Sequence, residues 1–147
     1  MRIRCLSVLI LAVSFCACSR PSQIATESPA QASPELRIQQ IPPADPQNFP
    51  NSRETKVWRN PYLMVKKDGI WLVDLNNNEE RLLKSDQVLD ALASLPASAW
   101  PYGRVVAVQE IGSAGTEDDK IALRRNRAIL AGTLESAKVL INWVPSS

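Results

Sequence analysis

The chain has 147 residues, with 17 Lys and Arg against 15 Asp and Glu, so its formal net charge is +2. A content of 45% hydrophobic and 22% charged residues is globular, and the length allows one domain. Histidine is absent, which excludes Ser-His-Asp and Cys-His catalytic sites and His-based metal sites. The balanced charge argues against a nucleic-acid partner, because binding to the phosphate backbone needs a clustered basic surface.

The N-terminus has the plan of a secretory signal peptide. Two arginines precede an apolar run over residues 6–15, which is too short to span a bilayer as a helix. The run ends in Cys16, Ala17 and Cys18, and this ending resembles the signal of a bacterial lipoprotein, in which cleavage leaves a lipid-modified cysteine as the first residue. The resemblance implies a signal peptide over residues 1–17 and a lipid on Cys18, with Cys16 as the competing attachment point. An ordinary signal peptide with an incidental cysteine is the alternative.

The distribution of cysteines supports a lipid anchor. Cys5, Cys16 and Cys18 are the three cysteines of the chain, and all lie inside or at the end of the signal. The exported part therefore has no disulfide framework. Several acyl chains on Cys18 would hold the protein firmly on a membrane, so we expect a cell-envelope location with the folded part facing the periplasm or the exterior.

Residues 18–56 are predicted to be a lipidated N-terminus followed by a disordered linker. Seven prolines fall between residues 20 and 50, among Ser, Gln, Ala and Thr: Pro21, Pro29, Pro34, Pro42, Pro43, Pro46 and Pro50. Such a stretch buries too little apolar surface to offset the cost of ordering it, and its prolines favour extended conformations. The alternative is a loop packed on the domain.

Residues 57–147 are predicted to form a small α+β domain that begins with a hairpin. Runs rich in β-forming residues at 62–65 and 70–73 are separated by a turn that contains Asp68 and Gly69. An Asp-Gly pair between such runs is a strong hairpin signal, because the turn needs positive φ angles. The Asn run at 76–78 ends the second strand, since Asn tolerates turn conformations.

Two helices and two strands follow the hairpin. Ser85 caps a helix over residues 86–95, and residues 104–111 form a strand that is buried on both faces. Thr116 caps a second helix with an acidic first turn and a buried stripe of apolar residues, and residues 138–144 close the chain as a strand. The buried stripe consists of Leu123, Leu130, Leu134 and Ala137.

The order ββαβαβ predicts a small two-layer sandwich with its helices on one side of the sheet. This order, together with the Lys67-Asp68-Gly69 turn, the helix start at 83–89 and the buried strand at 105–108, resembles the periplasmic domain of the ExbD/TolR family of membrane-energised transport proteins. The resemblance covers about residues 60–144 and implies a domain that dimerises and contacts envelope partners or the cell wall. The family's ion-driven motor role is not implied, because the N-terminal apolar run has no carboxylate.

Two groups of residues are candidates for a partner or ligand surface. Trp100, Tyr102 and Arg104 lie in a loop before the buried strand, and such residues are common anchors of interfaces. The alternative for the two aromatic side chains is that they cover the end of the core. A second group, Arg124, Arg125 and Arg127, could pair with anionic partners or could form the solvated face of a helix.

The acidic run at 116–119 could collect a divalent cation, but helix capping explains it fully, since it lacks the ligand spacing of a calcium loop. No catalytic motif, metal site or cofactor site is predicted. We therefore expect a non-enzymatic envelope lipoprotein that binds an envelope protein or a second copy of itself, and no nucleic acid. A binding module for a wall polymer or small ligand, using the Trp100 to Arg104 loop, is the alternative, and a hydrolase is a distant third.

Overall fold

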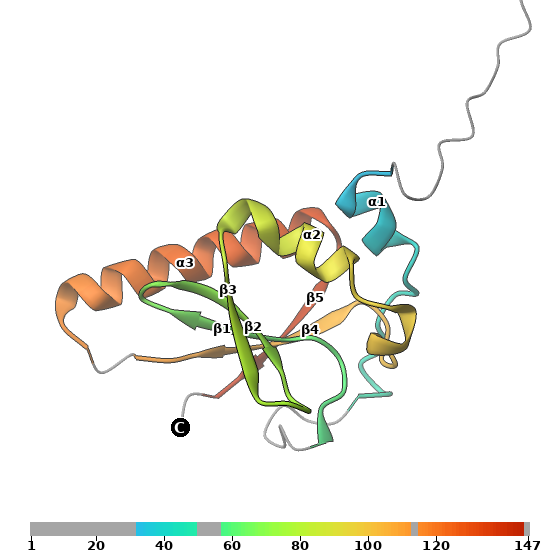
Figure 1. The fold of residues 1–147 in the computed structure, drawn as a ribbon, viewed down its shortest axis with the longest axis horizontal. Coiled ribbons are helices and arrows are strands. Elements are labelled where there is room, and N and C mark those ends of the chain that lie inside the picture. Colours follow the sequence, from blue (N-terminus) through green and yellow to red (C-terminus); the bar gives the residue numbers. More distant parts are fainter. Residues whose placement is uncertain (1–31, 50–56, 113–114, 146–147) are drawn as a thin grey trace, which may run out of the picture.

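The computed structural model describes residues 32–49, 57–112 and 115–145. These residues form an α+β domain with a five-stranded mixed sheet and three α-helices (Figure 1). The predicted signal peptide, the lipid site at Cys18 and the first part of the predicted linker lie outside the described residues.

The elements follow one another as helix, three strands, helix, strand, helix and strand. Short 3₁₀ turns at Ser85–Gln87 and Ala97–Ala99 flank the second helix. The bounds are α1 Pro34–Gln39, β1 Tyr62–Lys66, β2 Gly69–Asp74, β3 Glu79–Leu83, α2 Val88–Ala93, β4 Val105–Glu110, α3 Glu117–Ser136 and β5 Leu140–Val144.

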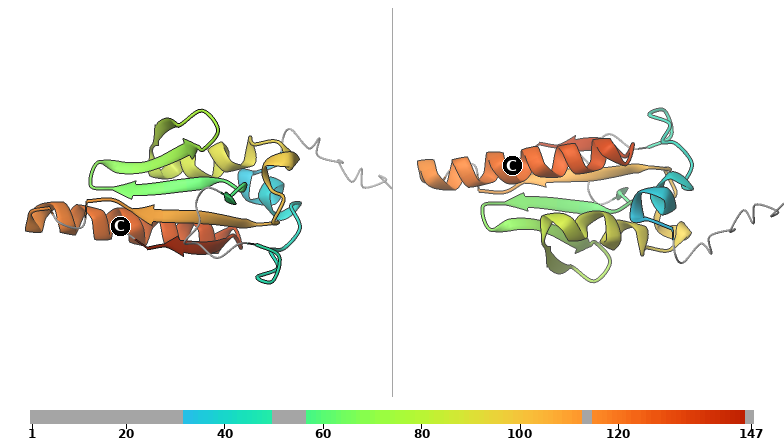
Figure 2. Two further views of the ribbon diagram at one scale, coloured as in Figure 1. Left: turned by 90° about the horizontal axis from the view of Figure 1, so that it is seen from below. Right: turned by 90° about the horizontal axis from the view of Figure 1, so that it is seen from above.

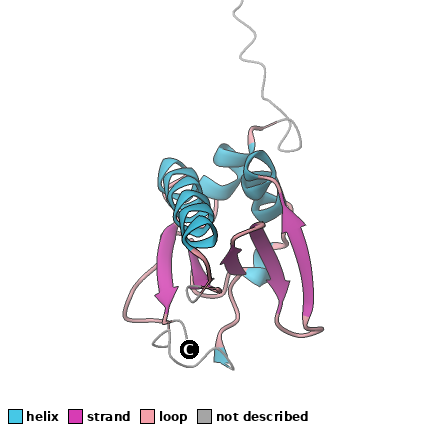
Figure 3. Ribbon diagram, turned by 90° about the vertical axis from the view of Figure 1, so that its left-hand side faces the viewer, coloured by secondary structure: helices cyan, strands magenta, loops and turns pink. Residues whose placement is uncertain are grey.

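The strand order across the sheet is β3-β2-β1-β4-β5. The strands β1, β2 and β3 pair antiparallel, whereas β4 pairs parallel with both β1 and β5. Parallel neighbours need a crossover, and α3 supplies it between β4 and β5. The three helices lie on one face of the sheet (Figure 3). The strand order makes β3 and β5 its two edges.

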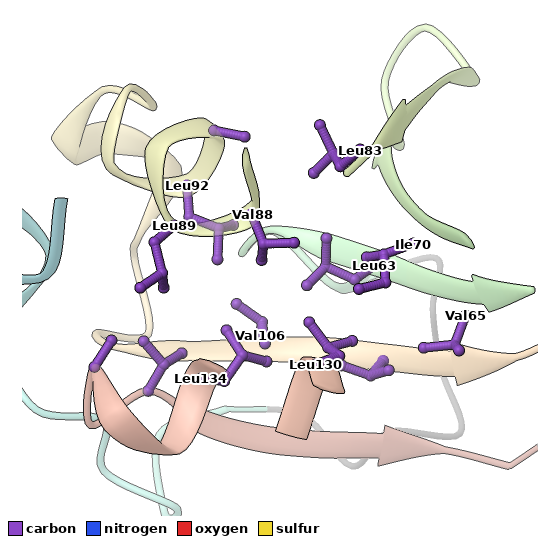
Figure 4. Packing of buried hydrophobic residues seen from close by; sticks show 14 of the residues in the cluster. Leu63, Val65, Ile70, Leu83, Val88, Leu89, Leu92, Val106, Leu130 and Leu134 are labelled. Atoms are coloured by element: carbon purple, nitrogen blue, oxygen red, sulfur yellow. The ribbon is translucent and has the colours of Figure 1, made fainter. Parts of the chain in front are cut away.

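The main core lies between the sheet and the helices. Side chains from β1 and β4 meet the apolar faces of α2 and α3 there (Figure 4). Its fully buried members include Leu63, Val106, Leu92, Leu130 and Leu134. Packing of this kind is the principal source of the domain's stability, because each such side chain gains about 1.5–3 kcal/mol when it leaves water.

A second apolar cluster lies on the opposite face of the sheet. Tyr62, Met64, Val105 and Ala107 are buried there with Trp58, and Phe49 and Tyr102 pack against them. The Trp58 ring contacts Phe49 edge-on at 6.0 Å and lies 5.5 Å from the Tyr102 ring, both measured between centroids. Both faces of the central strands are therefore covered.

Several predicted elements are confirmed. The hairpin forms with β1 and β2 paired antiparallel, and the valines of β4 are buried on both faces. The hydroxyl of Thr116 accepts a hydrogen bond from the Asp119 N–H at 3.3 Å, while the Asp119 carboxylate accepts one from the Thr116 N–H at 3.2 Å. This reciprocal cap fixes the start of α3 at the predicted place.

The predicted order ββαβαβ is incomplete, because it lacks β3. We expected the chain to leave the sheet after the Asn run, but Asn78 adopts a left-handed φ of 56° and turns the chain back as β3. Only Leu83 of β3 is buried, so the strand carries no alternating pattern that would reveal it. The predicted helix at 86–95 is also shorter, since its first turn is the 3₁₀ turn at Ser85–Gln87.

The linker prediction is wrong for residues 32–49, which pack on the domain. Ser33 caps α1 by accepting a hydrogen bond from the Leu36 N–H at 3.4 Å, and Pro34 occupies the first turn. Ile38 is fully buried in the main core, and Arg37 forms an ion pair with Asp90 of α2 at 3.2 Å. Proline at the start of a helix costs nothing, because the N–H that it lacks has no partner there.

Candidate interaction surface

The most distinctive surface feature is the outer edge of β5. The N–H of Leu140 donates to the carbonyl of Arg104 at 2.9 Å, toward the neighbouring β4. Alternate residues of a strand direct their backbone groups to opposite sides, so Ile141 and Trp143 direct theirs toward the free edge. The strand contains no charged residue and no proline, and Leu140 is 43% exposed. Such an edge can accept another strand.

The opposite edge, β3, is protected. It carries Glu79, Glu80 and Arg81, all exposed, and charged side chains on an edge oppose pairing with another strand. Within the described sheet, β5 is therefore the edge without such protection.

The flank of α3 runs beside β5. A shallow hollow of about 410 Å³ lies between them, with Ala131 and Glu135 on the helix side and Leu140 and Ile141 on the strand side. Further along, the guanidinium of Arg127 lies 4.4 Å from the centre of the Trp143 ring. The β5 edge thus continues into the flank of α3, which runs beside the strand (Figure 2).

The predicted binding loop at Trp100 to Arg104 is mostly internal. Trp100 is 4% exposed and belongs to the main core, which is the alternative that we gave for it. Tyr102 is half-buried on Trp58, and its hydroxyl donates to the carbonyl of Val57 at 3.2 Å. Arg104 is half-buried, and its N–H donates to the carbonyl of Pro42 at 2.9 Å. The aromatic side chains hold segments of the domain together and offer little surface to a partner.

Asn60 holds this loop to the segment before β1, and Gly103 lies against the N-terminal arm, by which we mean residues 33–49. The buried carboxamide of Asn60 donates to the carbonyls of Gly103 and Val105 at 2.7 and 2.8 Å and accepts from the Tyr102 N–H at 2.9 Å. Gly103 has φ +75°, and a Cβ there would lie 2.7 Å from the carbonyl oxygen of Pro43. Only glycine allows the arm to cross the loop this closely.

The three candidate arginines are exposed on α3 and do not converge. Arg124 lies 3.6 Å from Glu117, and Arg127 forms a 2.7 Å ion pair with Glu110 in addition to its contact with Trp143. Arg125 has no ion pair within the described ranges. Glu117 and Glu110 offset part of the positive charge of this group.

The acidic run caps α3, as the alternative for it predicted. A hydrogen bond from Lys67, 2.9 Å away, lowers the pKa of the Asp119 carboxyl below its usual value, and Thr116 contributes in the same direction. Among the described residues no group of three or more Cys, Asp or Glu side chains is placed to hold a metal ion. Burial raises the pKa of the Tyr62 hydroxyl, which donates to Gln109 at 2.7 Å.

A cleft that the sequence did not predict opens at the end of the sheet where β1 begins. It has a volume of about 740 Å³ and apolar walls from Leu72 and Leu95, with Arg59 and Asp74 among its polar residues. Asp74 is held by the turn after β2, where it accepts from the Asn76 N–H at 2.8 Å. Three segments far apart in the sequence form this cleft, so no local pattern could have shown it.

Comparison with known proteins gives no relative. No family model matches the chain, no curated protein matches it, and no solved structure matches it. Within the described ranges, no helix combines the length and the apolar character needed to cross a membrane.

Proposed function

We propose that this chain is a membrane-anchored envelope lipoprotein whose folded domain is a non-enzymatic protein-interaction domain. The anchor is the lipid on Cys18 that the signal sequence implies, and the interaction is strand addition at β5. The observation that carries the proposal is the unprotected β5 edge, which contrasts with the charged β3 edge of the same sheet. The resemblance of the sequence at the 67–69 turn, the 83–89 helix start and the 105–108 strand to the ExbD/TolR periplasmic domain supports the same class of function, although the structure adds β3 to the element order.

Strand addition is the mode that this surface fits. The N–H and C=O groups of Ile141 and Trp143, which have no partner among the described residues, supply main-chain hydrogen bonds, and the half-buried side chains supply apolar contacts. Main-chain pairing requires an extended partner, so a protein segment fits the edge better than a small ligand.

Site-specific photo-cross-linking in intact cells tests this proposal. A photo-reactive amino acid replaces Leu140 on β5 and, as a matched control, Leu82 on β3, because the two side chains are similarly exposed at 43% and 49%. We expect a discrete protein adduct from position 140 and none from position 82. Equal labelling at both positions, or no adduct at 140, would contradict the proposal.

Intact mass of the mature protein tests the anchor. We expect the mass of residues 18–147 plus acyl chains from membranes, and loss of that species in the Cys18→Ser variant. An unmodified mass together with continued export of the variant would show a freely diffusing secreted domain instead.

The second candidate function is a binding module for a small ligand or a wall polymer. The 740 Å³ cleft supports it, because its size is typical of ligand sites and it combines apolar walls with Arg59 and Asp74. Arg59→Ala would weaken the binding of a soluble wall fragment to this cleft, whereas Tyr102→Phe in the originally predicted loop would leave it unchanged. Calorimetric titration of both variants distinguishes the two places.

A further inference from the structure

We infer that the strand added at β5 is β5 of a second copy of this chain, antiparallel to the first, around a two-fold axis at Asn142. This inference rests on the proposed function and names its partner. The two five-stranded sheets then continue into one another with all helices on the same face. A two-fold interface of this kind is self-complementary and closed, so it gives a dimer and not a filament.

The backbone of β5 satisfies the pairing rule for this axis. Asn142 is the middle of the five residues of β5, so a centre there pairs the strand over its whole length. Ile141 of one copy then lies opposite Trp143 of the other. Both residues direct their N–H and C=O groups out of the edge, since the Leu140 N–H is directed inward to Arg104. In an antiparallel pair, two opposite residues that direct their N–H and C=O groups toward one another form two main-chain hydrogen bonds.

The side chains of β5 also match under this symmetry. Ile141 and Trp143 lie on the helix-covered face and are only half-buried in one copy. Ile141 of each copy would pack against Trp143 of the other copy. An aromatic side chain beside a β-branched one is a favourable cross-strand pair. On the other face, the exposed Leu140 lies opposite Val144 of the second copy, which would cover it.

The flank of α3 has the same two-fold symmetry. Ala131 and Glu135 line the hollow beside β5, and helical spacing places Arg124 and Ala128 in the same row. In an antiparallel arrangement Arg124 lies opposite Glu135 of the second copy, because the arginine and the glutamate are equally far from the middle of the two alanines. Opposite charges therefore meet at both ends of the flank, and small residues leave room at its centre.

The helix and the strand have their centres of symmetry at the same level along β5. Arg127 lies on the ring of Trp143, whereas Ala131 lines the hollow with Leu140 and Ile141. The middle of the α3 flank is consequently beside the middle of β5, at Asn142. A single two-fold axis thus relates backbone, side chains and charges, and this agreement between two separate elements favours a second copy over an unrelated strand.

A cysteine at the axis tests the geometry. The full chain carrying Asn142→Cys is oxidised in membranes and run on a non-reducing gel. The two Cα atoms at position 142 form a non-hydrogen-bonded pair about 4.5 Å apart, which is within disulfide range. We expect a disulfide-linked dimer from this variant. Leu82→Cys on the β3 edge is the matched control, the wild-type chain gives the background from the native cysteines, and neither should form that dimer.

A charge swap tests the helix flank in the detergent-extracted full chain. Arg124→Glu or Glu135→Arg alone should weaken dimerisation about ten-fold in sedimentation, because each places like charges opposite one another at both ends of the flank. The double variant should restore the wild-type dimer. Since Arg124→Glu faces Glu117 within its own chain in both the single and the double variant, restoration must come from the second copy.

The outcomes separate this inference from the proposed function. A monomeric wild-type chain at about 100 μM, where even a weak specific contact of micromolar Kd would be saturated, overturns the second-copy inference. A double variant that stays as weak as the singles overturns it as well. An adduct from position 140 to a different protein would then leave the proposed strand addition standing with another partner, whereas no adduct at position 140 overturns both.

Discussion

Lys138 shows how one residue can store strain at a turn. It follows α3 with φ 58°, a left-handed conformation that suits glycine, while the next residue, Val139, donates its N–H back to the Leu134 carbonyl at 2.9 Å. A side chain in this conformation costs about 1–2 kcal/mol. The strain at Lys138 therefore lowers the stability of the domain, but the turn that it forms directs the chain into β5.

Lys138→Gly should raise the free energy of unfolding by about 0.5–1 kcal/mol, because glycine adopts this φ without strain but also loses more entropy on folding. Urea unfolding followed by tryptophan fluorescence measures the change. Ser136→Gly, two residues earlier at the last position of α3, is the control and should be destabilising by up to about 1 kcal/mol. A loss of stability in Lys138→Gly would contradict the role assigned to this turn.

Asp119 links the start of α3 to the β1–β2 turn through Lys67. The folded state lowers the pKa of its carboxyl, so the stabilisation is present above the unfolded pKa, about 4, and is lost as the pH falls through the folded value. We expect wild type to exceed Asp119→Asn in unfolding free energy by a constant amount at pH 5 to 7. That difference should shrink steadily below pH 4.

Asparagine keeps an oxygen that can accept the Thr116 N–H, so this comparison isolates the charge. Acid titration of the urea midpoint in both proteins measures it, with Lys67→Gln as the control that should reduce the same pH dependence and leave the part due to Thr116. A difference that persists unchanged to pH 2 would show that the ion pair has no part in stability.

At the scale of elements, α1 changes the boundary of the folding unit. Ile38→Ala should lower the free energy of unfolding by about 2–4 kcal/mol, because the side chain is fully buried in the main core. Leu36→Ala on the same helix is the matched control, since Leu36 is 51% exposed, and should change stability by less than about 0.5 kcal/mol. Equal and negligible effects in thermal unfolding would restore the original interpretation of this segment as a linker.

The elements that sequence patterns predicted are those whose signals are local. Four consecutive apolar residues predict β4, and Thr116 with its acidic first turn predicts α3. Strand β3 has charged residues because it is an edge, and it forms because Leu83 packs into the core beside Ile70. In α1, the cap at Ser33 was readable, but proline-rich surroundings outweighed it, and burial of Ile38 depends on contacts distant in sequence.

The candidate surface, too, depends on contacts that are distant in sequence. The composition of β5 is visible in the sequence, and so is that of the equally apolar strand at 62–65. Which of the two is free depends on the strand order, which places β1 in the interior of the sheet and β5 at its edge. The choice between the two alternatives for Trp100 also needed the structure, because only the assembled core shows that its ring is enclosed.

At the scale of the whole molecule, the docking of α1 shortens the chain that would separate the domain from the proposed lipid anchor at Cys18. With the folded part beginning near Ser33, about 14 residues separate it from Cys18, and these extend to at most about 50 Å. An anchored domain is therefore confined to a thin layer above the bilayer. Within such a layer, diffusion is two-dimensional and the local concentration of copies is high, so even a weak edge-to-edge contact would be occupied.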